Sequence, residues 1–326
     1  MAKKQHINGF DLLRIISVTA VIGSHTLYTE SGPLQILKHL SFAVPCFVMM
    51  AVYLSLGYFN NKSESWQYFL RKRATRLIPA FLVWTAIYVT ARWVTGSIDF
   101  PSLNIWVEYF LLGAAALHLY FIPLIFYYSV ILVIINKSDW FQLPASFIGL
   151  LVSVCLQHKI PTIRFTTPEA NAFPYYFIHN LPYLFIGIFF FYLIEKNNTL
   201  KQYSTNLANY ITLIFGACTI IIWFIPDMIS KNIHSYQIIR DSFIFLTFRF
   251  CIIDIPKWLI SVTNVSFGIY LSHHLIFQGL FMLKKQTGIF LTTTWSVLIY
   301  FVVGMSITIG FNILLGKIKQ IRWMSV

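Results

Sequence analysis

The sequence predicts an all-α, polytopic integral membrane protein with about ten transmembrane helices and with both termini in the cytoplasm. Of its 326 residues, 57% are hydrophobic and only 11% are charged. Soluble globular chains carry about 25% charged residues, so this chain has too little polar surface to cover itself in water and requires a lipid bilayer. The same composition excludes a disordered chain, a coiled coil and a disulfide-stabilised secreted domain.

Ten apolar segments are candidates for the membrane-spanning helices, because a helix needs roughly 17–25 mostly apolar residues to cross the hydrocarbon core. They are residues 10–29, 39–59, 77–95, 114–135, 141–157, 173–194, 208–226, 238–253, 257–282 and 292–316. The eighth segment has the weakest support, since Arg240, Asp241 and Arg249 lie in or beside it. A re-entrant or interfacial position for this segment would leave nine spans.

The basic residues predict the orientation, because lysine and arginine favour the cytoplasmic loops of membrane proteins. With the N-terminus inside, the predicted cytoplasmic connections carry 14 lysines and arginines and the external connections carry 7. Omitting the eighth span reverses the last third of the chain and weakens this bias. The preferred topology therefore has ten spans, and the formal charge of +13 reports orientation rather than a nucleic-acid partner.

No linker and no repeat of fixed period divides the chain, so we expect one transmembrane domain over residues 1–326 without an appended soluble domain. Lys3 and Lys4 precede the first apolar segment as in a signal peptide, but Arg14 interrupts that segment and no small-residue cleavage site follows. The segment is therefore interpreted as the first transmembrane helix. The four cysteines show no CxxC spacing and are expected to be packing residues.

Arg14 and His25 lie within the first predicted helix, where an ionisable residue is a functional hypothesis by default. They are 11 residues apart, which corresponds to about 1100° of rotation and about 16 Å of rise, so both lie on one face. Arg14 is then near the cytoplasmic boundary and His25 is in the outer half. Two structural alternatives stay open: Arg14 extends to the interface, and His25 is a neutral, hydrogen-bonded core residue.

A cluster of cations precedes the third predicted span, with the sequence Arg71-Lys72-Arg73-Ala74-Thr75-Arg76. Such clusters are common where a helix ends at lipid headgroups. Arginine forks also match phosphate oxygens in pairs, so Arg73 and Arg76 are candidates for phosphate binding. Charge alone does not separate these two interpretations.

Further histidines are predicted to lie in the outer half of the membrane. His118 begins the fourth span, which runs inward, while His273 and His274 lie late in the ninth, which runs outward. His25, His118 and at least one of the adjacent pair could therefore meet at one depth. Three histidines are conceivable zinc ligands, but no His-x3-His pair or nearby carboxylate accompanies them, so no metal is expected.

These motifs, in this order, resemble the membrane-bound acyltransferase-3 family, whose members O-acylate bacterial surface and secreted glycans. The matching pieces are Arg14 with ten residues before His25, Arg73-x-x-Arg76-Leu77-x-Pro79, His118-Leu119-Tyr120-Phe121-Ile122-Pro123 and Ser266-Phe267-Gly268-Ile269-Tyr270-Leu271-Ser272-His273. Together they extend over most of the chain. The resemblance also implies a membrane domain of this kind with its N-terminus inside, in agreement with the charge bias.

The resemblance implies a reaction, namely transfer of an acyl group, most often acetyl, from cytoplasmic acetyl-CoA or another acyl-CoA to a sugar hydroxyl. The acceptor would be a surface or secreted polysaccharide, or its lipid-linked precursor, at the outer face of the bacterial cytoplasmic (inner) membrane. The implied partners are the lipid bilayer, this glycan and other polysaccharide-biosynthesis proteins.

The resemblance also suggests roles for individual residues. The expected coenzyme A-binding residues are Arg14, Arg73 and Arg76. His25 is expected to act as general base or to accept the acyl group itself, and the residues alone do not choose between these mechanisms. The expected stabilisers of the oxyanion are His118, Tyr270 and His273.

One motif departs from the family. On the second span the family commonly reads Val-Pro-x-Phe-Phe-x-x-Ser-Gly, whereas this chain has Val44-Pro45-Cys46-Phe47-Val48-Met49-Met50-Ala51-Val52. Ala51-Val52 therefore replaces a pair of small residues. This replacement puts in doubt a close backbone approach at that point and the usual shape of the acyl group.

Two other functions fit a polytopic membrane protein with internal charges. The first is a transporter or flippase for a lipid-linked glycan, but such proteins often show two related halves and none is found here. The second is a structural or scaffolding role in the membrane. Hydrolysis or transfer from labelled acetyl-CoA would distinguish the enzyme from both.

Overall fold

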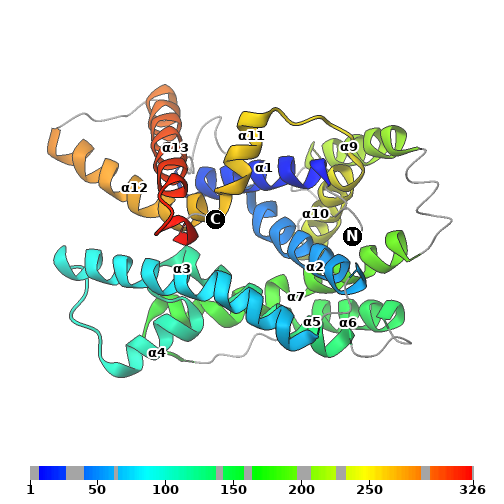
Figure 1. The fold of residues 1–326 in the computed structure, drawn as a ribbon, viewed down its shortest axis with the longest axis horizontal. Helices are drawn as coiled ribbons and strands as arrows, with labels where there is room; N and C mark the ends of the chain where they lie inside the picture. The colour runs from blue at the N-terminus through cyan, green and yellow to red at the C-terminus, as the bar shows by residue number, and fades with distance from the viewer. Residues whose placement is uncertain are drawn as a thin grey trace. The chain divides into compact units, whose positions relative to one another are not determined.

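Helices dominate the computed structural model, which describes residues 7–26, 40–61, 65–136, 142–157, 164–196, 207–224, 233–287 and 294–324 (Figure 1). These ranges contain no β-strand, so the predicted all-α fold is confirmed for them. The chain divides into two compact units. The first comprises residues 1–13, 44–75 and 102–254, and the second comprises residues 14–43, 76–101 and 255–326.

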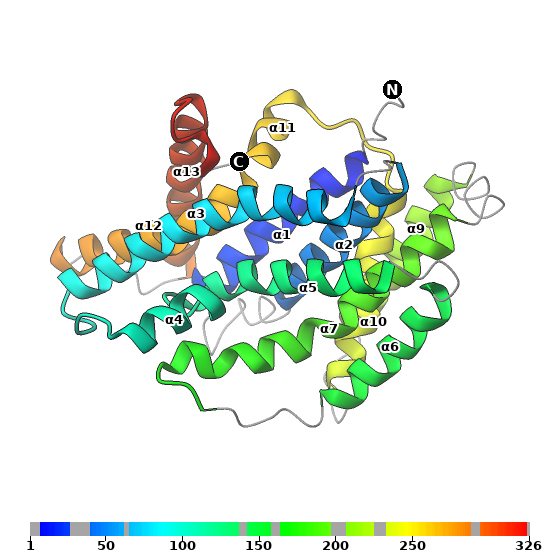
Figure 2. The same ribbon diagram turned by 60° about the horizontal axis from the view of Figure 1, so that its bottom comes forward.

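The first unit is built mainly from helices α2, α4, α5, α6, α7, α9 and α10. Their bounds are Ala43–Asn61, Leu103–Leu112, Phe121–Asn136, Gln142–Leu156, Pro168–Glu195, Ala208–Phe224 and Ile233–Phe250. Helix α6 packs along α7, and α9 packs along α10 (Figure 2). Helix α7 begins where Thr167 accepts a hydrogen bond from the backbone N–H of Ala170, and Pro168 follows at a position that needs no N–H donor.

The second unit contains α11 (Lys257–Asn264), α12 (Ser266–Thr287) and α13 (Thr294–Lys317), together with most of α1 (Asn8–Thr26) and of α3 (Trp66–Val94). Helix α12 packs against α13. At this contact the hydroxyl of Tyr300 donates to the carbonyl of Phe277 at 2.6 Å, and the two rings meet edge to face.

Among the described residues, five helical stretches are long and apolar enough to cross a bilayer by length and composition. They are Leu40–Phe59, Trp66–Val94, Leu117–Ile135, Pro168–Glu195 and Val297–Lys317. Each of the ten predicted segments overlaps a helix, although the outermost residues of several segments lie outside the described part of the chain. The membrane-spanning character is thus supported, while the number of spans and the orientation of the termini stay predictions.

Two sequence predictions need correction. The segment 257–282 is not one helix, because α11 and α12 are separated at Val265, whose N–H bonds to the carbonyl of Val262 in a tighter turn. The run Ser261-Val262-Thr263-Asn264 explains the break, since β-branched and short polar residues disfavour helix interiors. In addition, residues 103–112 form helix α4, which the apolar pattern had not indicated.

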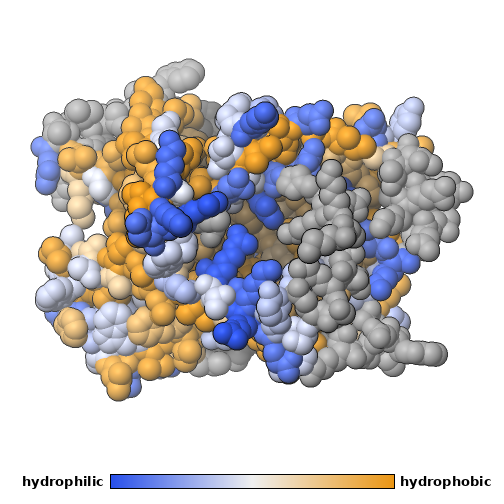
Figure 3. Space-filling view, in the orientation of Figure 1, coloured by the Kyte–Doolittle hydropathy of each residue, from blue (hydrophilic) through white to orange (hydrophobic). Residues whose placement is uncertain are grey.

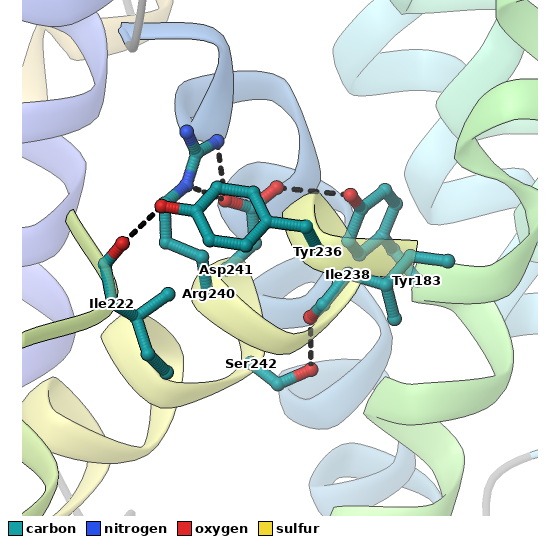
Figure 4. Close-up of polar contacts among 7 residues, drawn as sticks. All are labelled: Tyr183, Ile222, Tyr236, Ile238, Arg240, Asp241 and Ser242. Carbon is teal, nitrogen blue, oxygen red and sulfur yellow. Dashed lines mark hydrogen bonds and ion pairs between the residues drawn. The ribbon is translucent and has the colours of Figure 1, made fainter. Parts of the chain in front are cut away.

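Helix α10 contains three charged residues, and two of them pair with each other. Arg240 Nε donates to Asp241 Oδ1 at 2.8 Å, and the hydroxyl of Tyr183 on α7 donates to Asp241 Oδ2 at 2.9 Å (Figure 4). Both charged side chains are 1% exposed. A buried charge is tolerated when it is paired and hydrogen-bonded, so these residues are compatible with a helix inside the bundle despite their effect on hydropathy.

The third charge of α10 belongs to a second cluster in the first unit. Arg249 forms an ion pair with Glu195 at the end of α7, and its Nε donates to the hydroxyl of Tyr53 at 2.7 Å. That hydroxyl in turn donates to Glu195 at 2.7 Å. The three side chains thus connect α2, α7 and α10.

Helix α13 has an apolar outer surface (Figure 3). Ile299 and Leu314 are each 61% exposed, and Val302 is 58% exposed. In water such a row would be a large unfavourable apolar patch, whereas acyl chains would solvate it. The exposed side of α13 therefore fits contact with lipid.

The departure at Ala51-Val52 leaves a close contact in place, because the small residue is supplied by the facing helix. A β-carbon at Gly187 of α7 would lie 3.2 Å from the carbonyl oxygen of Met49 and 3.2 Å from the side chain of Val52. Helices α2 and α7 therefore approach closely at this point. The replacement of the small pair by Ala51-Val52 therefore does not remove the close backbone approach between α2 and α7.

Gly113 ends α4 and directs the chain toward His118. Its φ is +70°, and a β-carbon there would lie 2.6 Å from the carbonyl oxygen of Leu119. We expect Gly113→Ala to lower the free energy of unfolding by about 2–4 kcal/mol, from left-handed strain of roughly 1–2 kcal/mol plus overpacking. Gly96→Ala is the matched control, because Gly96 has φ +67° and open space around it. Thermal unfolding in detergent should show the larger loss for Gly113→Ala; equal losses would contradict the packing argument.

Candidate active site

The second unit contains a cluster of histidines. His25, near the end of α1, stacks on His273 of α12 with ring centroids 5.8 Å apart and an interplanar angle of 30°. The ring of His274 lies 6.2 Å from that of His25. The structure therefore brings His25 together with both members of the predicted pair.

The surroundings of His273 determine its tautomer. Its side chain is fully buried, and its Nδ1 lies 2.6 Å from the carbonyl oxygen of Tyr270. A carbonyl only accepts hydrogen bonds, so Nδ1 carries a proton, and in the Nδ1–H tautomer Nε2 is an acceptor. Tyr270 is itself buried, with its ring centroid 6.0 Å from that of His273.

Tyr88 of α3 contacts the backbone of α12 at the turn that carries both histidines. Its hydroxyl donates to the carbonyl of Leu271 at 2.9 Å and accepts from the N–H of Leu275 at 3.1 Å. In an α-helix these two groups also pair with each other. The Tyr88 hydroxyl thus bonds to the backbone of α12 on either side of His273 and His274.

A polar contact from α13 meets the same turn. Asn312 Nδ2 donates to the hydroxyl of Ser272 at 2.7 Å, and that hydroxyl donates to the carbonyl of Gly268 at 2.8 Å. Both side chains are fully buried. Tyr88 and Asn312 were not predicted as site residues from the sequence, although a polar residue in an apolar span is a signal that could have identified them.

The remaining predicted site residues of the second unit are Arg14 and Arg76. Arg14 is half-buried in α1, and Arg76 is exposed on α3. Arg73 and His118 belong to the first unit.

His118 lies in a short 3₁₀ turn, Leu117–Tyr120, and not in the helix of the predicted fourth span, which begins at Phe121. Its side chain is 4% exposed. Beside it, the ring of Tyr120 stacks on that of Tyr176 with centroids 4.1 Å apart. The turn follows from Gly113, whose positive φ ends α4 a few residues earlier.

Arg73 lines a small pocket in the first unit. Its Nη1 donates to the hydroxyl of Ser55 at 2.8 Å, and its guanidinium lies 5.8 Å from the centroid of the Phe69 ring. The cavity has a volume of about 10 Å³ and is lined by Ala51, Val52, Ser55, Arg73, Ile125, Tyr128, Ser129 and Leu132. Complete ligand sites measure about 300–1,000 Å³, so this cavity is far too small to hold a ligand.

Glu108 of α4 connects two segments that the predicted topology places outside the membrane. Its carboxylate accepts hydrogen bonds from the backbone N–H groups of Thr166 at 2.6 Å and Thr167 at 2.9 Å. Burial raises the pKa of the Glu108 carboxyl, but these bonds outweigh burial and hold the pKa below its usual range. The resulting stabilisation is present above the pKa of the unfolded state and is lost as the pH falls through the folded pKa.

Within the described ranges, no group of three or more His, Cys, Asp or Glu residues is arranged to hold a metal ion. The four cysteines are all free.

The apolar helices and the cluster of His25, His273 and His274 define a membrane protein with a histidine-containing site. A family model described as an acyltransferase domain, that of the acyltransferase-3 family, matches residues 7–316. The chain therefore belongs to this family and is a membrane acyltransferase. No curated protein and no solved structure matches it.

Proposed function

We propose that the protein moves an acetyl group from cytoplasmic acetyl-CoA to a hydroxyl of a surface or secreted polysaccharide, or of its lipid-linked precursor. The reaction would take place in the bacterial cytoplasmic membrane, with multiple spans separating donor from acceptor. The main support is the meeting of His25, His273 and His274 in the second unit of an acyltransferase-3 chain.

In the proposed step, His25 takes the proton of the acceptor hydroxyl while the oxygen attacks the thioester carbon. The ester C–O bond forms, the C–S bond breaks, and the proton passes to the thiolate of coenzyme A. In the two-step alternative, a ring nitrogen of His25 attacks the thioester carbon, the C–S bond breaks, and the imidazole proton passes to the leaving thiolate of coenzyme A. The acceptor hydroxyl then attacks the acyl-imidazole, the C–N bond breaks, and the hydroxyl proton returns to the imidazole. Both steps develop negative charge on the carbonyl oxygen and need a donor that stabilises it.

Tyr270, His118 and His273 are the proposed donors to this oxyanion. Because the Nδ1–H of His273 donates to the carbonyl of Tyr270, the ring in this tautomer offers Nε2 as an acceptor and not as a second donor. Within the second unit, the hydroxyl of Tyr270 is therefore the better candidate.

Arg14, Arg73 and Arg76 are the proposed contacts of the coenzyme A phosphates. The exposed guanidinium of Arg76 is free of burial cost, and Arg73 lies one turn before it on α3.

The phosphate contacts predict a change in donor affinity. Arg73→Ala/Arg76→Ala should raise the KM for acetyl-CoA by at least about tenfold, since a hydrogen bond to a charged group contributes roughly 1.5–3 kcal/mol. Lys72→Ala is the matched control, because its ammonium lies over the rings of Tyr58 and Tyr68 in the same cation cluster. An equal rise in both variants would assign the cluster to general charge and topology.

The proposed function itself is tested with purified protein and acetyl-CoA labelled in the acetyl group. We expect slow hydrolysis without acceptor and transfer when lipid-linked glycan is added. Mass spectrometry of surface polysaccharides from cells with and without the protein should show a difference of one acyl mass. A protein that releases no label but moves the glycan across liposome membranes would instead be a flippase.

A further inference from the structure

The contact between Tyr88 and α12 involves an unusual use of a buried hydroxyl. The side chain of Tyr88 is 1% exposed, and its hydroxyl makes two hydrogen bonds to backbone groups of α12. These groups belong to Leu271 and Leu275, so the hydroxyl binds the turn of α12 that contains His273 and His274. Side chains that enter the hydrogen-bond ladder of a helix are a recognised cause of local bending.

The geometry points to Tyr88 as a positioning residue for the histidine cluster, an inference that rests on the proposed function. The direction of a helical side chain follows the backbone that carries it. The ring planes of His273 and His274 relative to His25 therefore depend on the backbone turn to which the Tyr88 hydroxyl is bonded. The ring of Tyr88 also lies 6.2 Å from that of His274, which limits how far this histidine can rotate.

The same turn receives a second, independent contact from Asn312 of α13 through Ser272. The backbone between Gly268 and Leu275 is thus bonded to side-chain hydroxyls at three carbonyl or N–H groups. Loss of the Tyr88 hydroxyl would remove two of these three bonds. The turn would then be free to shift and to carry the two histidine rings away from their present directions.

The test compares Tyr88→Phe with Tyr300→Phe. Tyr300 also donates one hydroxyl bond to the backbone of α12, but at Phe277, beyond the histidine turn. We expect Tyr88→Phe to lower kcat about 10–100-fold with the donor KM unchanged, because displacement of a catalytic group by about 1 Å has effects of that size. Tyr300→Phe should keep wild-type kcat, and 4-aminophenylalanine at position 88, which restores a donor, should recover part of the lost rate.

A second readout does not depend on activity. The rates at which diethyl pyrocarbonate modifies His273 and His274, followed by peptide mass spectrometry, should rise in folded Tyr88→Phe and stay at wild-type values in Tyr300→Phe. If the wild type transfers no acetyl group while these rates still differ, the proposed function fails and the positioning role stands. Unchanged kcat together with unchanged modification rates in Tyr88→Phe would overturn the inference, as would equal losses in both variants.

Discussion

His25→Ala is expected to lower the rate of acetyl transfer by about 10²–10⁴-fold, the range that positioned general acid–base groups contribute. The reason is geometric as well as chemical, since His25 is the α1 residue that stacks on His273 and lies beside His274. The rate should be measured with saturating labelled acetyl-CoA, so that a change in donor affinity does not obscure the loss.

His179→Ala provides the matched control for this substitution. His179 lies in α7 of the first unit, where its ring stacks on Tyr175 with centroids 5.3 Å apart. The substitution His179→Ala also removes an imidazole, but from another helix. It should leave the rate within about twofold of wild type, as expected for a side chain outside the reacting groups. Wild-type activity in His25→Ala would reject the proposed mechanism in both of its forms.

The two forms of the mechanism can then be separated. Rapid denaturation near neutral pH of the enzyme mixed with labelled acetyl-CoA and no acceptor should trap an acetyl group on His25 if the transfer has two steps, because acyl-imidazoles hydrolyse quickly in acid. Absence of label on the protein during steady turnover would favour direct attack with His25 as general base.

Asp241→Asn is expected to cause the largest loss of stability, about 3–5 kcal/mol, because it removes one partner of a buried ion pair. The guanidinium of Arg240 would keep its charge at 1% exposure without the carboxylate that accepts two of its hydrogen bonds. Thermal or denaturant unfolding in detergent measures this loss.

Two variants serve as references for that experiment. Tyr183→Phe removes only the hydroxyl bond to Asp241 and should cost about 1 kcal/mol, the net contribution of an ordinary hydrogen bond. Arg240→Met/Asp241→Leu replaces the whole pair by apolar groups and should recover much of the stability, since such replacements are often neutral. If Asp241→Asn were no less stable than the double variant, leaving the buried charge of Arg240 without its carboxylate partner would carry no cost, which would contradict the prediction.

Much of the architecture follows from local composition. Apolar runs such as the one in α13 must avoid water wherever they lie in the fold, so helix positions could be predicted from hydropathy alone. The break at Val265 could not, because a short run of β-branched and polar residues is a weak signal within an otherwise apolar stretch. The charged residues of α10 lower the hydropathy of that segment, so its sequence alone gives only a weak indication of a membrane span. The structure shows that Asp241 and Arg249 have partners on α7.

The candidate site divides in a similar way. His25, His273 and Arg73 could be selected from the sequence, because a charged or titratable side chain within an apolar segment is costly and therefore conspicuous. Nothing in the chain order indicated that Tyr88 would reach the backbone of Leu271, or that Gly187 would accommodate Val52. Such contacts join residues far apart along the chain. They arise only when packed helices bring a hydroxyl to the backbone of another helix, or a side chain to a glycine. Residue identity decided which groups are available for chemistry, and tertiary packing decided which of them meet.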